Sequence, residues 1–203
     1  MTCIIGLEHD GNVYMGADSL SSNGWGAYYS DASKIFQIGE YLVGVSGSWR
    51  LNQLLRYGFH WPDFEGKVSY EPMATIVIGV IDPLRVYLKE HGYSRISENE
   101  ESTPEGRILI GFRGRVYEVQ SDFSVLTYDE GFSCIGSGSL YAYGAMYAAK
   151  CDRPTNRMTK ALWAAATYDP YTSNPFTFMS SDDLVREENE ESEQGKEKSN
   201  EAE

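Results

Sequence analysis

Residues 2–19 read TCIIGLEHDGNVYMGADS and predict a β-hairpin at the start of the chain. Both halves are rich in apolar and β-branched residues, and the Asp-Gly pair at 10–11 is a favoured two-residue turn. With that turn as the loop, residues whose numbers sum to 21 face each other, so that Asp18 lies opposite Cys3. The hairpin therefore returns the Asp18 carboxylate to the level of Thr2.

The rest of the chain divides into blocks of strands and blocks of helices. The elements predicted in order are a strand pair over 33–38 and 41–47, a helix capped by Ser48, a helix through 73–93 that is bent or interrupted at Pro83, a polar loop over 94–106, a hairpin around Gly114, a strand over 132–138, helices over 139–150 and from about 155, and a turn with a short strand within 168–179. Segregated blocks favour an α+β fold with two packed sheets covered by helices on both sides.

Composition and charge exclude several classes of function. The chain has 203 residues, 41% of them apolar, which is ordinary for one domain with a hydrophobic core. No run approaches the roughly 18 consecutive apolar residues of a membrane span, and no basic segment opens the sequence, so neither a membrane anchor nor a secretory signal is expected. A net charge of −13 argues against nucleic acid or an anionic membrane as a partner.

The chain is predicted to consist of a folded domain over 1–181 and an acidic tail over 182–203. The tail holds ten acidic residues against three basic ones, and its segment 186–203 contains no apolar residue except one alanine. So little apolar surface does not offset the entropy of ordering a chain, so we expect the tail to be disordered.

Cysteines and histidines show no pattern of a metal site, a catalytic triad or a disulfide framework. They are few and scattered, without a CxxC pair: Cys3, His9, His60, His91, Cys134 and Cys151. We therefore expect no metal and no organic cofactor, and a reducing cytoplasm as the location. Cys3 could serve as a nucleophile only if Thr2 were also removed, which the sequence disfavours.

Thr2 is the first candidate catalytic residue. A threonine in second place is small enough for the initiator methionine to be removed, and no propeptide is expected ahead of it. The free α-amine of a first residue has a reference pKa of about 7.7–8.0 and can act as base toward the hydroxyl of the same residue. One residue then supplies nucleophile and base. Since many chains begin Met-Thr by chance, Thr2 needs support from other residues.

Asp18 and Lys34 provide that support. A lysine near the hydroxyl and the amine favours the deprotonated forms of both through its positive charge. A buried lysine needs a carboxylate partner, and Asp18 lies at the correct end of the hairpin to be one. Taken singly, Asp18 is better explained as a strand-end residue and Lys34 as a surface charge.

Three later positions complete the set of candidates. Gly47, in GVSGS, lies between a strand and a helix, where its N–H can stabilise an oxyanion. Ser137, in IGSGSLYAYG, can bond an N-terminal amine; a dinucleotide loop is disfavoured because tyrosine replaces the third glycine. Asp169, with Thr172 or Ser173 in YDPYTSN, can hold the serine and the amine. A tight turn before a capped helix is the plainer interpretation of Gly47, and an Asp-Pro turn that of Asp169.

Taken together, the segments 2–19, 33–48 and 135–148 resemble the β-type subunits of proteasomes and the peptidase subunit of the bacterial two-component heat-shock protease. The resemblance extends from Thr2 to about Met179. It implies a four-layer αββα sandwich, the fold of the N-terminal-nucleophile (Ntn) hydrolases, and a threonine endopeptidase that cleaves peptides or unfolded proteins inside a homo-oligomeric ring. An ATPase unfoldase partner stays an open question.

The same resemblance assigns roles to the candidate residues. Thr2 matches the nucleophile, Asp18 and Lys34 the acid and the lysine, Gly47 the oxyanion glycine, Ser137 the serine near the amine, and Asp169 and Thr172 the late acid and hydroxyl.

The sequence also departs from the family pattern. Leu20 stands where proteasome subunits often have arginine, and Trp49 and Arg50 are bulkier than the usual residues, which changes the expected pocket shape. Two alternatives stay open, an Ntn amidase acting on a small amide and an inactive ring-forming subunit. The presence of Thr2, Asp18 and Lys34 together argues against the second.

Overall fold

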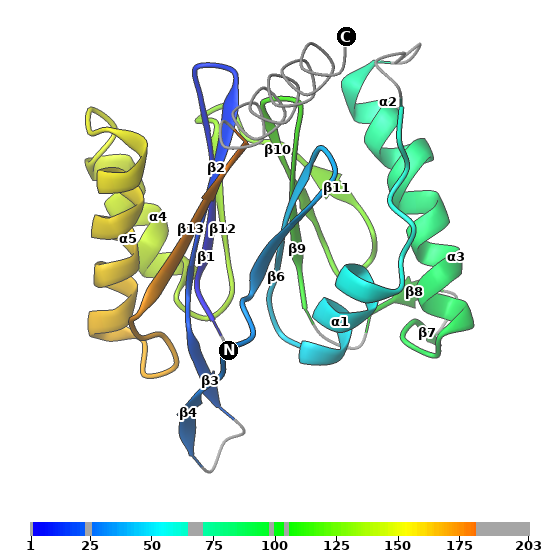
Figure 1. Cartoon of the computed structure of the whole chain (residues 1–203), viewed down its shortest axis with the longest axis horizontal. Coiled ribbons are helices and arrows are strands. Elements are labelled where there is room, and N and C mark those ends of the chain that lie inside the picture. Colours follow the sequence, from blue (N-terminus) through cyan, green and yellow to red (C-terminus); the bar gives the residue numbers. More distant parts are fainter. Residues whose placement is uncertain (1, 23–25, 65–70, 98–99, 104–105, 182–203) are drawn as a thin grey trace, which may run out of the picture.

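The computed structural model describes residues 2–22, 26–64, 71–97, 100–103 and 106–181 (Figure 1). The predicted acidic tail over 182–203 lies outside these residues, so its disorder and the domain boundary at 181 remain predictions.

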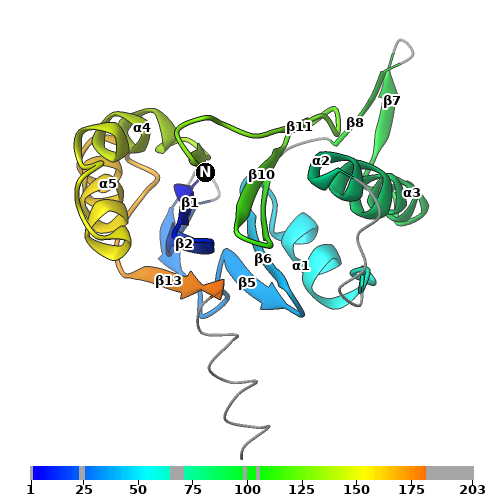
Figure 2. The same cartoon turned by 90° about the horizontal axis from the view of Figure 1, so that it is seen from above.

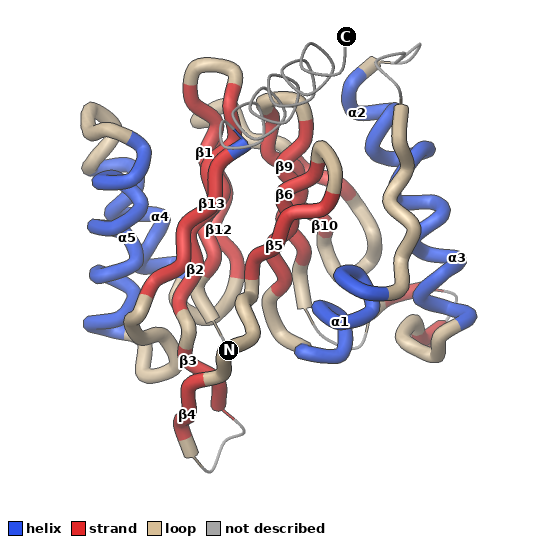
Figure 3. Tube along the Cα trace, viewed as in Figure 1, coloured by secondary structure: helices blue, strands red, loops and turns tan. Residues whose placement is uncertain are grey.

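Two antiparallel sheets form the centre of the molecule (Figures 1 and 3). The four-stranded sheet has the order β12 (Phe132–Ile135), β1 (Ile4–His9), β2 (Asn12–Asp18), β13 (Phe176–Ser180). The five-stranded sheet has the order β11 (Val125–Leu126), β10 (Arg115–Val119), β9 (Ile108–Phe112), β6 (Tyr41–Val45), β5 (Ile35–Ile38).

The first hairpin has the predicted register. Ile4 pairs with Ala17 and His9 with Asn12, so the paired numbers sum to 21. The turn residues 10 and 11 have φ values of 49° and 78°, the left-handed conformation that a two-residue hairpin turn requires. The later hairpins, with turns at 39–40 and 113–114, also lie where the sequence predicts them.

Helices cover the outer face of each sheet, as the view from above shows (Figure 2). The helices α4 (Ser139–Ala148) and α5 (Pro154–Tyr168) lie on the four-stranded sheet. The helices α1 (Trp49–Tyr57), α2 (Pro72–Ile76) and α3 (Asp82–Glu90) lie beside the five-stranded sheet. This arrangement confirms the predicted α+β class.

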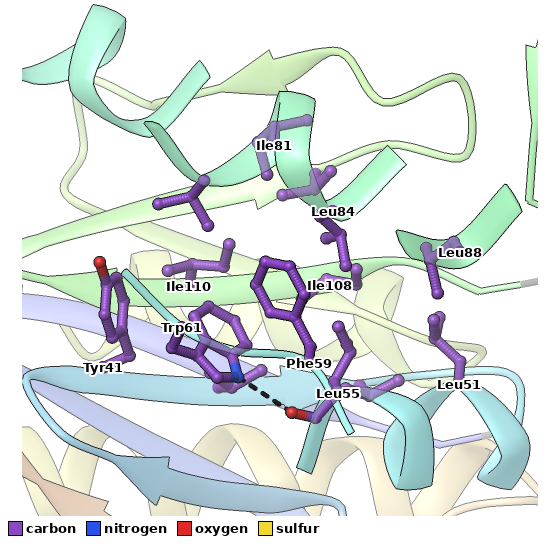
Figure 4. Packing of buried hydrophobic residues seen from close by; sticks show 14 of the residues in the cluster. Tyr41, Leu51, Leu55, Phe59, Trp61, Ile81, Leu84, Leu88, Ile108 and Ile110 are labelled. Atoms are coloured by element: carbon purple, nitrogen blue, oxygen red, sulfur yellow. Dashed lines mark hydrogen bonds between the residues drawn. The ribbon is translucent and has the colours of Figure 1, made fainter. Parts of the chain in front are cut away.

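Alternation along β1 explains why its first four residues, 4–7, include no polar side chain. Ile4 faces the other sheet and Ile5 faces α4 and α5, and both are fully buried, because successive strand side chains point to opposite faces. The largest cluster lies between the five-stranded sheet and α1–α3 (Figure 4). There Trp61 donates its indole N–H to the Leu55 carbonyl (2.9 Å), so that its polar atom is satisfied within the core.

The helix predicted through 73–93 is interrupted just before Pro83. Residues Val77–Ile81 form one π-helical turn, in which the Asp82 N–H bonds to the Val77 carbonyl, and α3 begins immediately after it. Proline has no N–H and its ring collides with the carbonyl four residues earlier in an α-helix. The wider π turn accommodates Pro83 with the chain still helical.

The prediction of a loop over 94–106 is wrong in part. This segment contains β7 (Arg95–Ser97) and β8 (Glu100–Ser102), which pair antiparallel. A second short pair, β3 (Leu20–Ser22) and β4 (Ala27–Tyr29), also went unpredicted. All four strands have three residues and lack the alternation of apolar residues that marks a half-buried strand.

None of the helices described in the chain has the length and apolarity that a membrane crossing requires.

Truncation of Leu84 tests the core under α3. Leu84→Ala should lower the free energy of unfolding by about 2–5 kcal/mol, because the side chain is fully buried and the cavity will not close completely. Val86→Ala on the same helix is the matched control, since Val86 is exposed, and should change it by less than about 0.5 kcal/mol. Urea denaturation followed by circular dichroism measures both. Equal losses for the two variants would contradict this packing.

Candidate active site

The Asp18 carboxylate is the hydrogen-bonding centre of the candidate site. It lies buried at the end of β2, where the hairpin register brings it beside the start of β1. Its Oδ1 atom accepts bonds from the Thr2 hydroxyl (2.9 Å), the Cys3 N–H (2.8 Å) and the Lys34 Nζ (2.7 Å). Thr2, Asp18 and Lys34, predicted to act together, therefore lie in one buried cluster.

The segment after Asp18 closes around the same charges. The Leu20 N–H donates to Asp18 Oδ2 (3.1 Å), and the Leu20 carbonyl accepts from Lys34 Nζ (2.7 Å). The Ser173 N–H, from the loop before β13, also donates to Oδ2 (3.4 Å). Burial lowers the pKa of Lys34 below its ordinary value, and the Asp18 carboxylate opposes that shift.

A second network holds the backbone of Thr2 from the opposite side. The Thr2 nitrogen donates to Ser137 Oγ (3.2 Å), and the Ser137 hydroxyl donates to Asp169 Oδ2 (2.7 Å). The Thr172 hydroxyl donates to the same oxygen (2.7 Å), and the Tyr171 N–H donates to Oδ1 (3.2 Å). The structure thus brings Ser137, Asp169 and Thr172 together around the Thr2 nitrogen, whereas Ser173 contacts Asp18 instead.

The two glycines that flank Ser137 allow this close approach. A Cβ atom on Gly136, which has φ of 97°, would lie 2.2 Å from the Thr2 carbonyl oxygen. A Cβ atom on Gly138 would lie 2.8 Å from Thr172 Oγ1 and 3.0 Å from Cys3 Cβ. The Gly-x-Gly motif therefore lets the β12–α4 turn pack against β1, and no phosphate is needed to explain it.

A small open pocket lies over Thr2. Gly47, at the turn between β6 and α1, lines it together with Thr2 and Lys34, and its φ of 91° is unfavourable for other residues. Ser48 accepts the Arg50 and Leu51 N–H groups and caps α1 as predicted. The remaining lining residues are Leu20, Ser21, Ser22, Val45, Ser48, Trp49 and Asn52.

Two residues of α1 that the sequence did not single out hold the segment of Lys34 and the start of β5. Asn52 Nδ2 donates to the carbonyls of Ser33 and Lys34 (both 3.4 Å). Arg56 Nη2 donates to the carbonyls of Ser33 (2.9 Å) and Ile35 (3.0 Å). The signal in the sequence is an asparagine between Leu51 and Leu54, on the apolar side of an amphipathic helix, where a polar side chain needs a buried partner.

Cys3 has the environment of a core residue. Its side chain is fully buried in the cluster beneath α4 and α5. Burial, reinforced by the nearby Asp18 charge, raises the pKa of its thiol far above the ordinary value, which disfavours the nucleophilic thiolate. Within the described ranges, no group of three or more His, Cys, Asp or Glu side chains is placed to hold a metal ion.

No protein-family model matches the sequence, and no curated protein matches it. Solved structures do match. The bacterial proteasome homologue BPH of Thiobacillus denitrificans superposes with a TM-score of 0.68 over 88% of this chain and 97% of the other, at 26% identity alone and 25% in complex with epoxomicin. Eukaryotic HslV from Trypanosoma brucei superposes with a TM-score of 0.62 at 17% identity, over 88% of this chain and 98% of the other.

The match to HslV shows the fold alone, and the match to the Thiobacillus protein extends the likeness to about a quarter of the residues. Both matches cover 88% of this chain and nearly the whole of the other chain, so the similarity is not limited to a part of the fold. The resemblance to proteasome-type and heat-shock-protease peptidase subunits is thereby confirmed, and this chain is a structural relative of the bacterial proteasome homologue and of HslV.

Proposed function

We propose that this chain is a threonine-type endopeptidase with the four-layer αββα fold of the Ntn hydrolases, and that it cleaves peptide bonds through Thr2. The observation that carries the proposal is the position of Thr2 between two networks at the edge of an open pocket. One network holds its hydroxyl and the other holds its nitrogen. An N-terminal nucleophile needs both atoms fixed, because the hydroxyl reacts and the nitrogen takes its proton.

The proposed reaction begins when Met1 has been removed and the Thr2 nitrogen is a free amine. Thr2 Oγ1 attacks the carbonyl carbon of the substrate while its proton passes to the amine. The resulting oxyanion is stabilised by the Gly47 N–H, and its collapse expels the leaving amine with that proton. The acyl ester on Thr2 is then hydrolysed by a water molecule that the same amine activates.

Lys34 acts on this reaction through its charge. Its Nζ and the Thr2 hydroxyl bond to the same Asp18 oxygen, so the ammonium group lies within the range at which charges shift a pKa. A positive charge there favours the alkoxide and the neutral amine. Asp18 holds both partners in place and keeps the buried lysine compensated.

The proposed setting is a homo-oligomeric ring in the cytoplasm that acts on peptides or unfolded proteins. Several large apolar side chains on α4 and α5 are exposed in the isolated chain, which supports burial of this surface in an assembly: Leu140, Tyr141, Tyr147, Trp163 and Tyr168. The relatives in these comparisons are proteasome-type proteins. An ATPase unfoldase is a candidate partner in such an assembly.

The cysteines are free, in accord with a reducing compartment.

Replacement of Thr2 tests the nucleophile. Thr2→Ala should abolish cleavage of fluorogenic peptides, because no hydroxyl remains, and Thr2→Ser should retain part of the activity, since it keeps hydroxyl and amine. A panel of peptides beside small acylated amines separates an endopeptidase from an amidase. Cleavage by Thr2→Ala at the wild-type rate would rule out this mechanism, and turnover of small amides alone would favour the amidase alternative.

Replacement of Lys34 tests the electrostatic role. Lys34→Ala should reduce kcat about 100-fold or more while the protein stays folded, because Asp18 keeps donors from Thr2, Cys3, Leu20 and Ser173. Lys89→Ala, which removes an exposed lysine on α3, is the control and should leave kcat unchanged. Circular dichroism verifies folding. A Lys34→Ala variant with near wild-type kcat would contradict the assigned role.

Assembly can be measured directly by light scattering. The purified chain should elute as a large oligomer, because a second copy would cover the exposed side chains of α4 and α5. A single species of 22.8 kDa at micromolar concentration, with full peptidase activity, would show that the ring is not required.

A further inference from the structure

Buried polar side chains interrupt the apolar space between the two sheets, and a chain of contacts connects them with the residue before Gly47. Elsewhere this space is apolar, with residues such as Ile4, Leu109 and Val116. The buried polar residues are Glu118 of β10, Ser133 of β12 and Ser46, which directly follows β6. None of these residues takes part in the networks around Thr2 described above.

Ser46, the residue before Gly47, is held by the residue that opposes it at the start of β9. The Ser46 N–H donates to the Arg107 carbonyl (3.0 Å), and so does the Ser46 hydroxyl (3.2 Å). The Arg107 N–H donates back to Ser46 Oγ (3.2 Å). A Cβ atom on Gly106 would lie 2.4 Å from the Ser46 carbonyl oxygen, so the backbone there packs directly on the peptide that leads into Gly47.

Arg107 is itself anchored by Glu118. Its Nη1 donates to Glu118 Oε1 (3.1 Å), in an ion pair whose carboxylate is 1% exposed. The carboxylate has further donors from the residue just after β10, from a loop and from the other sheet: Gln120 Nε2 (2.6 Å), the Tyr128 hydroxyl (2.9 Å) and the Ser133 hydroxyl (2.5 Å). These donors hold the Glu118 carboxylate in one position, and the carboxylate in turn holds the Arg107 side chain.

We propose that Ser46 is a positioning residue that orients the Gly47 N–H toward the oxyanion, through its bonds to the Arg107 peptide and the Glu118 anchor behind it. The inference rests on the proposed function. Gly47 has a left-handed φ and no side chain, so neighbouring residues must fix the direction of its N–H. Stabilisation of an oxyanion depends on a donor that is already aligned, and a loosened donor loses that contribution first.

The test compares a tetrahedral adduct with a complex that has no oxyanion. A peptide aldehyde forms a hemiacetal with the Thr2 hydroxyl, whereas the peptide alcohol of the same sequence binds without bond formation. Ser46→Ala should weaken inhibition by the aldehyde about 10-fold and lower kcat to a similar degree. Inhibition by the alcohol and the KM of the substrate should change less than about two-fold, since they involve no oxyanion. Ser46→Thr, which keeps the hydroxyl, should restore affinity for the aldehyde.

Thr75→Val is the matched control for the loss of a buried hydroxyl. Thr75 is 3% exposed and bonds to the Glu71 carbonyl (3.3 Å) in α2, away from the pocket, so this variant should leave the affinities for aldehyde and alcohol unchanged. Arg107→Met removes the side-chain contact with Glu118 and keeps the backbone N–H and carbonyl at position 107. This variant should weaken inhibition by the aldehyde by a few-fold and leave inhibition by the alcohol unchanged.

The outcomes separate this inference from the proposed function. A Ser46→Ala variant with unchanged aldehyde affinity, or with equal loss for aldehyde and alcohol, overturns the positioning role while the peptidase mechanism stands. Unchanged aldehyde affinity in Arg107→Met overturns the Glu118 anchor. If the wild-type protein forms no adduct with the aldehyde, the proposed function fails and the inference fails with it.

Discussion

The structure of the site depends on one buried charge, the Asp18 carboxylate. A carboxylate removed from water is costly unless charges and hydrogen bonds compensate it, and Asp18 is 2% exposed. Its donors are the Thr2 hydroxyl, the Lys34 ammonium group and three backbone N–H groups. They come from segments far apart in the sequence, so compensation of this charge requires the complete fold. The same requirement places the Thr2 hydroxyl beside a lysine.

A second acid, Asp169, performs a parallel task on the other side of Thr2. It accepts hydrogen bonds from the Ser137 and Thr172 hydroxyls, and Ser137 Oγ in turn accepts a hydrogen bond from the Thr2 nitrogen. The hydroxyl of Thr2 is thus bonded to the end of β2, and its nitrogen is connected through Ser137 to the β12–α4 turn and to Asp169 at the end of α5. Two polar networks on opposite sides leave Thr2 little freedom, which suits a residue proposed to provide both nucleophile and base.

Much of this arrangement could be predicted from local signals. The Asp-Gly turn sets the register of the first hairpin, and that register alone brings Asp18 to Cys3. Ser48 and the leucines that follow it predict α1 and its buried face. The resemblance to proteasome-type subunits then grouped Ser137, Asp169 and Thr172, which no spacing in the sequence relates.

What escaped prediction depends on contacts between distant segments. The strands β3, β4, β7 and β8 are short, and backbone pairing, which leaves no periodic pattern, defines them. Asn52 and Arg56 stabilise the segment around Lys34 by donating to backbone carbonyls. Every residue has a carbonyl, so the acceptors cannot be recognised in the sequence. The Ser46–Arg107 pair, whose members lie 61 positions apart, likewise depends on the pairing of β6 with β9.

The mass and the first residue of the active chain, measured after reaction with an epoxyketone such as epoxomicin, test the central claim most directly. With Met1 attached the Thr2 nitrogen is an amide without basicity, whereas after its removal the same atom is an amine that titrates near neutral pH. We expect active protein that begins at Thr2 and gains the mass of one inhibitor, located on Thr2 by peptide mapping. Active protein that retains Met1, or whose inhibitor adduct lies on another residue, would contradict it.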